Sequence, residues 1–277
     1  MIKLELTMDE FNLFRDYIYK KAGINYTEKK VIILQNRIRR RLRALSMSSY
    51  MDYYNIIKNK TIHDEEVIKF FDAVTTNETS FFRHEKQFHA LEEMIIPEIL
   101  KGKSRKQLNI WSAAASMGKE AYTIAMIVNE MAGIQSRNVK ILGTDLNSKV
   151  LEMAKHGEYS IKDTKEVDRK YLKYLVEDKK NEIVKVKDQL KDIITFKRFN
   201  LQDSFASIPK MDIIFCRNVF IYFTKETQTK LVEKFYERLN PGGFFILGHS
   251  ETLNGVFDKF EYRKFKNQNL MIYQKEM

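Results

Sequence analysis

The chain has 277 residues, of which 44% are hydrophobic and 31% charged, and its formal net charge is +11. This length allows one large domain or two modest ones with a sizeable core. No run of 18 apolar residues occurs, so we expect no insertion into a membrane. The single cysteine, Cys216, excludes internal disulfides and cysteine-built zinc sites, and it favours a cytoplasmic location. The positive charge favours an acidic partner without identifying it.

Residues 1–74 carry a helical pattern, and we expect an all-α N-terminal domain. Thr7 and Glu10 form a capping box at the first helix, Gly23 ends that helix, and Thr27 caps the next. The second helix is expected over 31–45. Its apolar face is formed by Leu34, Ile38, Leu42 and Leu45. The rest of its circumference is basic and is formed by Arg37, Arg39, Arg40, Arg41 and Arg43. A third helix is expected over 64–74.

Residues 75–84 are interpreted as a linker that carries function. The six residues from Thr75 to Ser80 are short and polar, and such side chains compete with helix formation by bonding to the backbone. A helix is expected over 85–101, with Phe88, Leu91 and Ile95 on its inner face.

Residues 85–277 are expected to form a doubly wound, Rossmann-like α/β domain with a parallel sheet. From residue 106 the pattern alternates between strands and helices. The expected strands are 108–113, 139–144, 194–199, 212–216 and 244–248, and the helices between them are 119–132, 148–155 and 225–239. Residues 158–192 are too long for a simple connection and predict a small β insertion, and residues 262–274 predict a closing antiparallel hairpin.

Ligands of open α/β sheets bind beyond the carboxyl ends of the strands. After the first strand, the turn before Glu120 contains one glycine, Gly118, which disfavours a dinucleotide because a pyrophosphate needs close backbone approach. Asp145 after the second strand suits ribose hydroxyls, and Asn200 with Leu201 after the third suits a base edge. These residues together indicate a nucleoside without phosphates, such as S-adenosylmethionine. Taken singly, Asp145 also suits a helix cap, Glu120 a first-turn acid and Asn200 a turn.

Five sequence runs occur in order along the chain: Thr75–Arg83, Trp111–Glu120, Gly143–Asp145, Phe215–Phe223 and Gly248–Glu251. Together they closely resemble the CheR family, the methyltransferases of bacterial chemotaxis, over essentially the whole chain. One departure is Ser-Met-Gly-Lys-Glu-Ala over 116–121, where the family usually has Ser-Thr-Gly-Glu-Glu-Pro; the second acid, Glu120, is kept.

The resemblance implies a class I methyltransferase that transfers a methyl group from S-adenosylmethionine to glutamate side chains of chemoreceptors. The products would be glutamate methyl esters and S-adenosylhomocysteine, with no metal required. The implied cofactor-binding residues are Asn77, Thr79, Arg83, Glu120, Asp145, Asn200, Leu201, Arg217 and Asn218, and those placed near the reacting methyl group are Arg83 and Tyr222. Arg83 would hold a carboxylate, either the cofactor's or the substrate's.

This chemistry agrees with the lack of a nucleophile–base pair in the sequence. Cys216 lies in an apolar strand, and we expect the five histidines to form no cluster. A glutamate carboxylate is already ionised near neutral pH and needs no general base.

The basic helix is interpreted as a docking surface for the glutamate-rich coiled coil of a receptor's cytoplasmic domain, through Arg37, Arg39, Arg40 and Arg43. A plain solvated face is the alternative, but like charges on neighbouring turns repel one another. In some relatives a glycine-containing loop of the β insertion grips a receptor tether peptide. The corresponding turn here, 177–182, has no glycine, so we expect no tether dependence. We also expect a monomer.

Three other functions fit the sequence less well. A nucleic-acid methyltransferase suits the charge, but the Asp/Asn-Pro-Pro-aromatic run of amino methylation is replaced by Arg217-Asn218-Val219-Phe220. A thiolate of Cys216, needed for cytosine C5 methylation, is disfavoured in an apolar strand. A cofactor-binding scaffold without turnover is the second alternative, and a nicotinamide-dependent dehydrogenase is the weakest.

Overall fold

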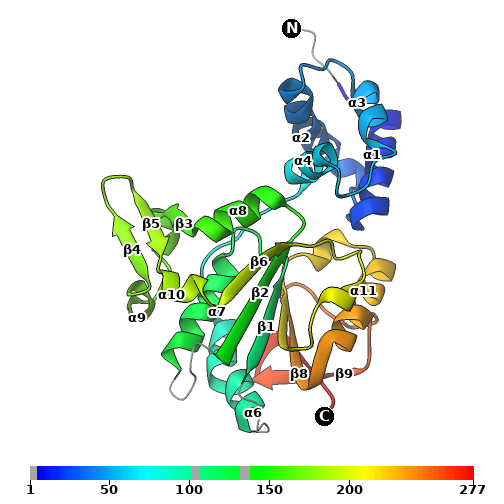
Figure 1. Ribbon diagram of the computed structural model, residues 1–277. Helices are drawn as coiled ribbons and strands as arrows, with labels where there is room; N and C mark the ends of the chain where they lie inside the picture. Colours follow the sequence, from blue (N-terminus) through cyan, green and yellow to red (C-terminus); the bar gives the residue numbers. More distant parts are fainter. Residues whose placement is uncertain (1–4, 102–106, 132–137) are drawn as a thin grey trace.

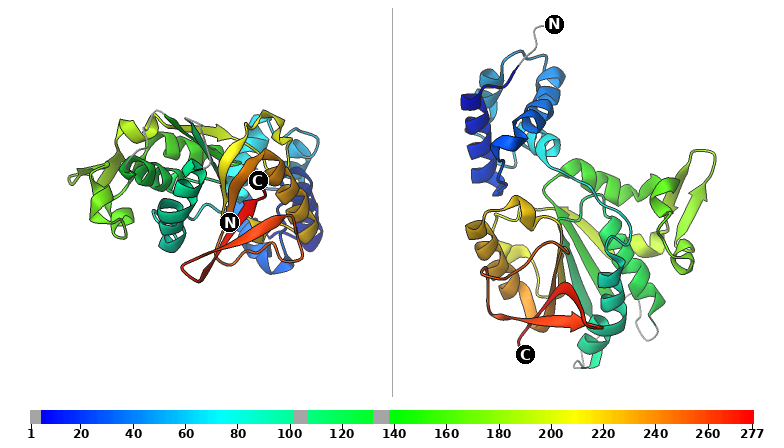
Figure 2. Two further views of the ribbon diagram at one scale, coloured as in Figure 1. Left: turned by 90° about the horizontal axis from the view of Figure 1, so that it is seen from below. Right: turned by 180° about the vertical axis from the view of Figure 1, so that it is seen from behind.

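The computed structural model describes residues 5–101, 107–131 and 138–277. Figure 1 shows a helical N-terminal part, a seven-stranded sheet with helices on both faces, and a small β subdomain that projects to one side. Seen from behind in Figure 2, the N-terminal helices lie above one end of the sheet, apart from the β subdomain. Across the described ranges, no helix is both long enough and apolar enough to cross a membrane.

The N-terminal part contains four α-helices and a short 3-10 turn around its own core. They are α1 (Met8–Ala22), η1 (Glu28–Lys30), α2 (Val31–Ala44), α3 (Tyr50–Ile57) and α4 (Glu65–Val74). The capping box of Thr7 and Glu10 and the left-handed C-cap at Gly23 are confirmed. Thr27 occupies the N-cap position of η1, but its side chain makes no capping hydrogen bond. Helix α3 was not among the predicted helices.

Two further predicted helices, 31–45 and 85–101, differ in detail from those observed. Leu45 is not part of the apolar face of α2, because the helix ends at Ala44 and Leu45 is 39% exposed as its C-cap. The helix expected over 85–101 is confirmed as α5 (Glu85–Ala90) and α6 (Ile96–Lys101), but the π-helical η2 (Leu91–Ile95) joins them. The wider turn precedes Pro97, which has no N–H to donate four residues back.

The large sheet confirms the doubly wound prediction. Its order is β6-β2-β1-β7-β8-β10-β9, parallel from β6 to β8 and completed by the antiparallel hairpin β9–β10. The strands are β1 (Leu108–Ala113), β2 (Val139–Asp145), β6 (Ile194–Arg198), β7 (Met211–Cys216), β8 (Leu239–Leu247), β9 (Phe260–Phe265) and β10 (Gln268–Lys275). Strand order reverses between β1 and β7, where ligands of such sheets bind.

The helices between these strands are α7 (Lys119–Glu130), α8 (Ser148–His156) and α11 (Lys225–Arg238), with short 3-10 turns η5 (Phe205–Ser207) and η6 (Phe220–Tyr222). The predicted stop of α7 at Gly133 lies outside the described residues. The helix predicted over 225–239 is confirmed to within one residue, but residues 240–243 belong to β8, which already pairs with β7 at Leu239. A register irregularity accommodates the Pro-Gly-Gly run within β8.

The predicted β insertion is confirmed as a three-stranded antiparallel sheet of order β3-β5-β4. This β subdomain contains β3 (Glu158–Ser160), η4 (Ile161–Thr164), α9 (Arg169–Leu172), β4 (Leu175–Asp178), β5 (Ile183–Val186) and α10 (Asp188–Lys191). Lys119, the departure from the family pattern, is buried and pairs with Asp163 of η4 at 3.0 Å. The substituted position therefore attaches the β subdomain to α7.

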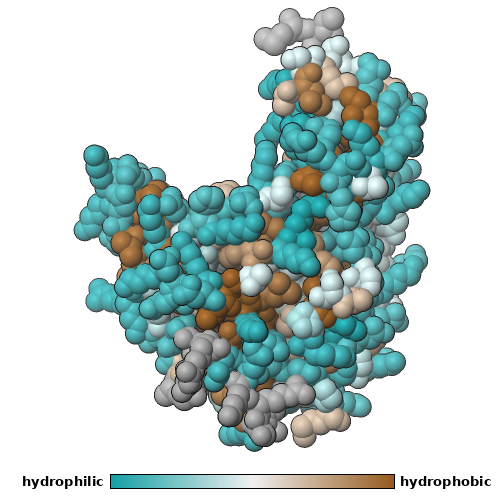
Figure 3. All heavy atoms as spheres, viewed as in Figure 1, coloured by the Kyte–Doolittle hydropathy of each residue, from teal (hydrophilic) through white to brown (hydrophobic). Residues whose placement is uncertain are grey.

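Hydrogen bonds fix the N-terminal part to the carboxyl edge of the sheet. Asp72 of α4 accepts from the N–H of Ser148 at 2.7 Å and from its hydroxyl at 2.6 Å. Asn200, just after β6, donates to the carbonyl of Lys21 at 2.8 Å. Figure 3 shows the surface hollowed between the N-terminal part and the β subdomain, with mostly hydrophilic side chains on both flanks. The edge where the ligand-binding crevice is expected is therefore covered by the N-terminal part.

Candidate cofactor and active site

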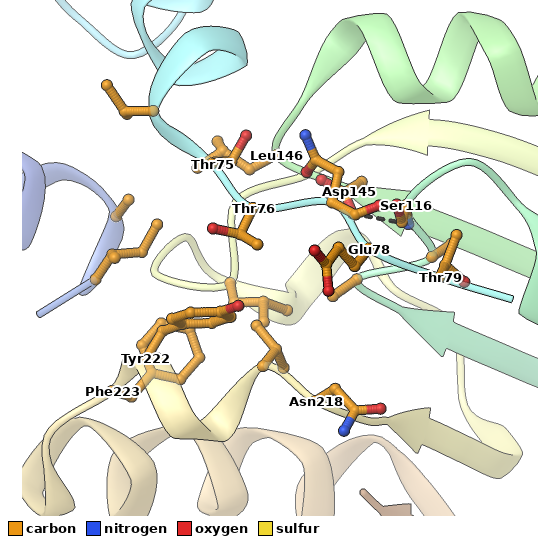
Figure 4. A pocket seen from close by; sticks show the side chains of 18 of the residues that line it. Thr75, Thr76, Glu78, Thr79, Ser116, Asp145, Leu146, Asn218, Tyr222 and Phe223 are labelled. Carbon is orange, nitrogen blue, oxygen red and sulfur yellow. Dashed lines mark hydrogen bonds between the residues drawn. The ribbon is translucent and has the colours of Figure 1, made fainter. Parts of the chain in front are cut away.

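A cavity of about 340 Å³ lies between the carboxyl edge of the sheet and the N-terminal part. Its walls come from the ends of β1, β2, β6 and β7, from the linker 75–84 and from the start of α2 (Figure 4). It brings together every predicted cofactor-binding and catalytic residue, namely Asn77, Thr79, Arg83, Glu120, Asp145, Asn200, Leu201, Arg217, Asn218 and Tyr222.

Asp145 ends β2 with its carboxylate held by the backbone. It accepts from the N–H groups of Ser116 at 2.8 Å and Asn147 at 2.9 Å, and Figure 4 draws the first of these bonds. Burial raises the pKa of Asp145, and these N–H donors oppose that rise. The Ser116 hydroxyl in turn donates to the carbonyl of Asn77 at 2.8 Å. The linker is thus attached to the turn that orients this carboxylate.

Glu120 and Arg217 form a buried ion pair that the sequence analysis did not foresee. The Glu120 carboxylate accepts from Arg217 Nη1 at 2.9 Å and from the Ser112 hydroxyl at 2.7 Å. The two side chains are 13% and 2% exposed. Burial lowers the pKa of Arg217, and the charge of Glu120 opposes that fall. Arg217 Nε is buried without a partner, which leaves a donor beside the pocket.

Asn200 and Leu201 lie in a turn that is fixed from two sides. The Asn200 amide donates to Lys21 O, and its oxygen accepts from Gln202 N–H at 3.1 Å. The ammonium of Lys234 on α11 donates to the carbonyls of Leu201, Gln202 and Asp203 at 2.9–3.2 Å. The Asn200 amide, expected to read a base edge, is therefore engaged with the backbone, while Leu201 contributes an apolar wall.

The loop after β7 is held by Glu251, whose role the sequence analysis did not assign. One carboxylate oxygen accepts from the N–H groups of Asn218 at 2.9 Å and Gly248 at 2.6 Å, and the other from Phe220 at 2.8 Å. Asn218 is in the left-handed region with φ 60°. A Cβ at position 248 would lie 2.6 Å from the Glu251 carboxylate, so glycine is required there.

Tyr222 ends this loop and faces the N-terminal part. Its carbonyl accepts from Asn25 N–H at 2.7 Å, and Lys30 Nζ lies 5.4 Å from the centre of its ring. Lys30, together with Ile33 and Arg37, lines the cavity. These three residues were not predicted at the pocket, because no local pattern indicates which residues of α2 and η1 meet the sheet.

The linker contributes charges of both signs. Arg83 Nη1 donates to the carbonyl of Glu78 at 3.1 Å, and the carbonyl of Arg83 accepts from Arg217. Figure 4 shows the Glu78 side chain, which was also missed, extending into the pocket. The lining contains four basic side chains and three acidic ones: Lys30, Arg37, Arg83 and Arg217, and Glu78, Glu120 and Asp145.

Two of the five histidines, which the sequence does not place together, meet in the fold. The rings of His84 and His249 lie with their centres 4.0 Å apart. Burial, together with the charges of Arg217 and Arg83, lowers the pKa of His84 to about 4, so it is neutral at neutral pH. Each histidine stands in or beside one of the five sequence runs, but their contact requires the folded chain.

The arginines of α2 separate into two sets. Arg37 and Arg41 are engaged within the protein, Arg41 with Glu66 at 2.8 Å. Arg40 and Arg43 are exposed, and Arg39 is half-buried.

Comparison with known proteins identifies the family. Residues 77–268 match the family model described as CheR methyltransferase, SAM binding domain, and residues 9–75 match the CheR methyltransferase all-alpha domain. The chain belongs to the CheR methyltransferase family.

Two sequence relatives support this assignment along the chain. A "chemotaxis protein methyltransferase" of Borreliella burgdorferi is 35% identical over 264 residues, covering 92% of each chain. One of the same name from Vibrio parahaemolyticus is 34% identical and covers 94% of this chain and 95% of that one. PKMT2 from Rickettsia typhi, solved in complex with AdoHcy, has a TM-score of 0.35 and 18% identity over 52% of this chain and 21% of that chain.

This CheR protein is therefore a methyltransferase that uses S-adenosylmethionine, and its donor set fits that cofactor. The carboxylate of Asp145 suits ribose hydroxyls, and the carboxylate of Glu120 suits an ammonium group. The unpartnered Arg217 Nε is a donor for a carboxylate. In the turn 113–118 the N–H groups of Ala115, Ser116 and Gly118 already donate to acceptors of the protein rather than facing a pyrophosphate, which agrees with rejecting the dehydrogenase alternative. Among the described residues, no three His, Cys, Asp or Glu side chains are grouped to hold a metal ion.

We predict that Glu251→Gln impairs this CheR enzyme without changing any residue that lines the cavity. An amide nitrogen would face backbone N–H donors, and losing a charge-assisted hydrogen bond costs about 1.5–3 kcal/mol. We expect the affinity for S-adenosylhomocysteine to fall at least about fivefold, together with kcat. Calorimetric titration and steady-state kinetics measure both.

Glu233→Gln provides the matched control, since Glu233 is exposed on α11. It makes the same change of charge and should leave both quantities within error. Unchanged affinity and kcat in Glu251→Gln would show that the loop does not need this carboxylate.

Proposed function

We propose that this enzyme methylates glutamate side-chain carboxylates on chemoreceptors, giving methyl esters for sensory adaptation. The observation that carries the proposal is the composition of the pocket. Its described lining contains no histidine and no cysteine, and two of its three acids, Glu120 and Asp145, are engaged by donors of the protein, while the third, Glu78, comes from the linker. An amine or carbon acceptor needs a group that removes a proton, whereas a carboxylate is ionised already. The names of the relatives, chemotaxis protein methyltransferases, support a receptor as the substrate.

When bound, S-adenosylmethionine supplies a methyl group that is already activated on a sulfonium. The protein's task is then to align the acceptor oxygen and to exclude water from it. We assign Lys30, Arg83 and Tyr222 to the acceptor side, because all three line the cavity and can donate to a carboxylate. Arg83 is half-buried and lines the cavity, where it would hold a carboxylate of either molecule.

The remaining lining residues are assigned to the cofactor side. Asp145 would accept from ribose hydroxyls, and Glu120 with Arg217 would meet the charged methionyl end. Leu201 would pack on the adenine, with Asn200 fixing the turn that presents it. Asn77, Thr79 and Asn218 would contribute polar contacts from the linker and the β7 loop.

The stability of the transferred label in alkali tests whether the acceptor is a carboxylate. Methyl-labelled S-adenosylmethionine, the enzyme and a folded receptor cytoplasmic fragment are incubated together, and alkali is then added. We expect label to be released as volatile methanol, because an ester is labile to base and an N-methyl or C-methyl group is not. A fragment whose glutamates are replaced by glutamine at the candidate sites serves as the control and should release none. Base-stable label on a folded receptor would overturn the glutamate assignment.

The exposed arginines of α2 are proposed to dock the substrate. Receptor methylation regions are rich in glutamate, and exposed Arg40 and Arg43, beside Arg39, provide a complementary charge on the helix that also supplies Ile33 to the cavity. Arg37 is excluded from this set because its guanidinium is bound within the protein.

Replacing Arg39, Arg40 and Arg43 with alanine should raise KM for the receptor fragment about tenfold at low salt, with kcat largely kept. Each exposed pair contributes about 0.2–1 kcal/mol, and added salt should shrink the effect. The matched control removes three exposed lysines at the far end of the sheet, Lys259, Lys264 and Lys266. An equal rise of KM in both triple variants would show that net charge, rather than α2, is responsible.

We also propose that no receptor tether is required. The turn between β4 and β5 contains no glycine, and Asp178 closes it by accepting from Asn181 N–H at 3.2 Å. Methylation rates for receptor fragments with and without their C-terminal tails should agree within about twofold at equal concentration, since a tether acts by raising effective concentration. Loss of methylation on removing the tail would contradict this.

A further inference from the structure

Arg37 joins α2 to the segment before η1 and, across more than thirty residues, to the end of α4 and the start of the linker. Its guanidinium donates to the hydroxyl of Tyr26 at 2.7 Å, to the hydroxyl of Thr76 at 2.8 Å and to the carbonyl of Val74. The Tyr26 hydroxyl donates to the same Val74 carbonyl. One side chain of α2 therefore links residue Tyr26 in the segment before η1, the end of α4 and the linker.

The position of Arg37 on α2 explains this inward role. Leu34, Ile38 and Leu42 form the buried stripe of the helix. Arg37 and Arg41 are four residues apart, so they lie on one face at the border of that stripe, and both are engaged within the protein. Arg40 and Arg43 lie farther round the helix and are exposed.

Arg37 acts where the linker begins. The last carbonyls of a helix lack partners within it, and a cation near the C-terminus also complements the helix dipole. Arg37 provides the Val74 carbonyl at the end of α4 with a hydrogen-bond donor and with a positive charge. It also donates to Thr76, the second residue of the linker. From Thr75 to Ser80 every residue lines the cavity, and the next anchor is the bond from the Ser116 hydroxyl to Asn77 O.

We propose that Arg37 is a positioning residue for cofactor binding, not a docking residue for the substrate. It holds the start of the linker in the conformation that completes the cofactor pocket. The two-pronged guanidinium is essential to this role, because one ammonium cannot bridge Val74 and Thr76 with the same geometry. The inference concerns the cofactor half of the site and holds whichever acceptor the enzyme methylates.

The test is calorimetric titration of the full chain with S-adenosylhomocysteine, with no acceptor present. For Arg37→Ala we expect affinity to fall at least about tenfold, and for Arg37→Lys at least about fivefold, although the lysine keeps the charge. Arg43→Ala removes the same charge from the same helix and should leave the affinity within about twofold. Wild-type affinity in Arg37→Ala, with KM for the receptor raised, would overturn the proposal and restore a docking role.

A double-mutant cycle separates positioning from loss of folding. Thr76→Val keeps the shape of the side chain and removes one partner of Arg37, so affinity should fall about threefold in the wild-type background and hardly further in Arg37→Lys. Additive effects would show that Thr76 acts without Arg37 and would overturn the proposal. Thermal unfolding of each variant is measured alongside, and the cycle decides the proposal even if Arg37→Ala does not fold.

Discussion

A buried ion pair spans the point where the strand order reverses. Glu120 lies in the first turn of α7, which follows β1, and Arg217 follows β7, so their 2.9 Å contact joins the two strand ends from which the chain departs in opposite directions. Arg217 also donates to the carbonyl of Arg83, which attaches the linker to the same pair. Removing one partner of such a pair leaves an uncompensated buried charge. This interaction therefore connects the floor of the crevice with the linker above it.

The site is complete because the N-terminal part covers the carboxyl edge of the sheet. An open α/β sheet supplies the ends of its strands, but here α2, η1 and the linker form the opposite wall. The contacts that hold this cover are largely between polar side chains and backbone groups, as in the bonds of Asp72 to Ser148 and of Asn200 to Lys21. Such bonds fix orientation more than they add stability, which suits a cover whose position defines the pocket.

The sequence was sufficient for features with a local cause. The capping box at Thr7, the period of the strands and the carboxylate ending β2 at Asp145 follow from neighbouring residues, and all are found in the structure. The contacts of Glu251 with Asn218 and of Arg37 with Val74 join residues more than thirty positions apart, and no periodicity indicates such partners. The mistake at Leu45 had the opposite origin, since the apolar pattern continued one residue past the end of the helix.

The charges of the pocket are arranged according to the part of the chain that supplies them. Glu120 and Asp145 come from the sheet, where backbone N–H groups and Arg217 fix them, whereas Lys30 and Arg37 come from the helical cover. Acids fixed by the protein can accept from hydroxyl or ammonium groups but are poorly placed to act as bases. On this cover Lys30 offers a positive charge to an anionic acceptor, which has no proton to lose, whereas the Arg37 guanidinium is bound within the protein. Under the proposed function, the sheet determines the cofactor, and the N-terminal part determines that the acceptor is a carboxylate.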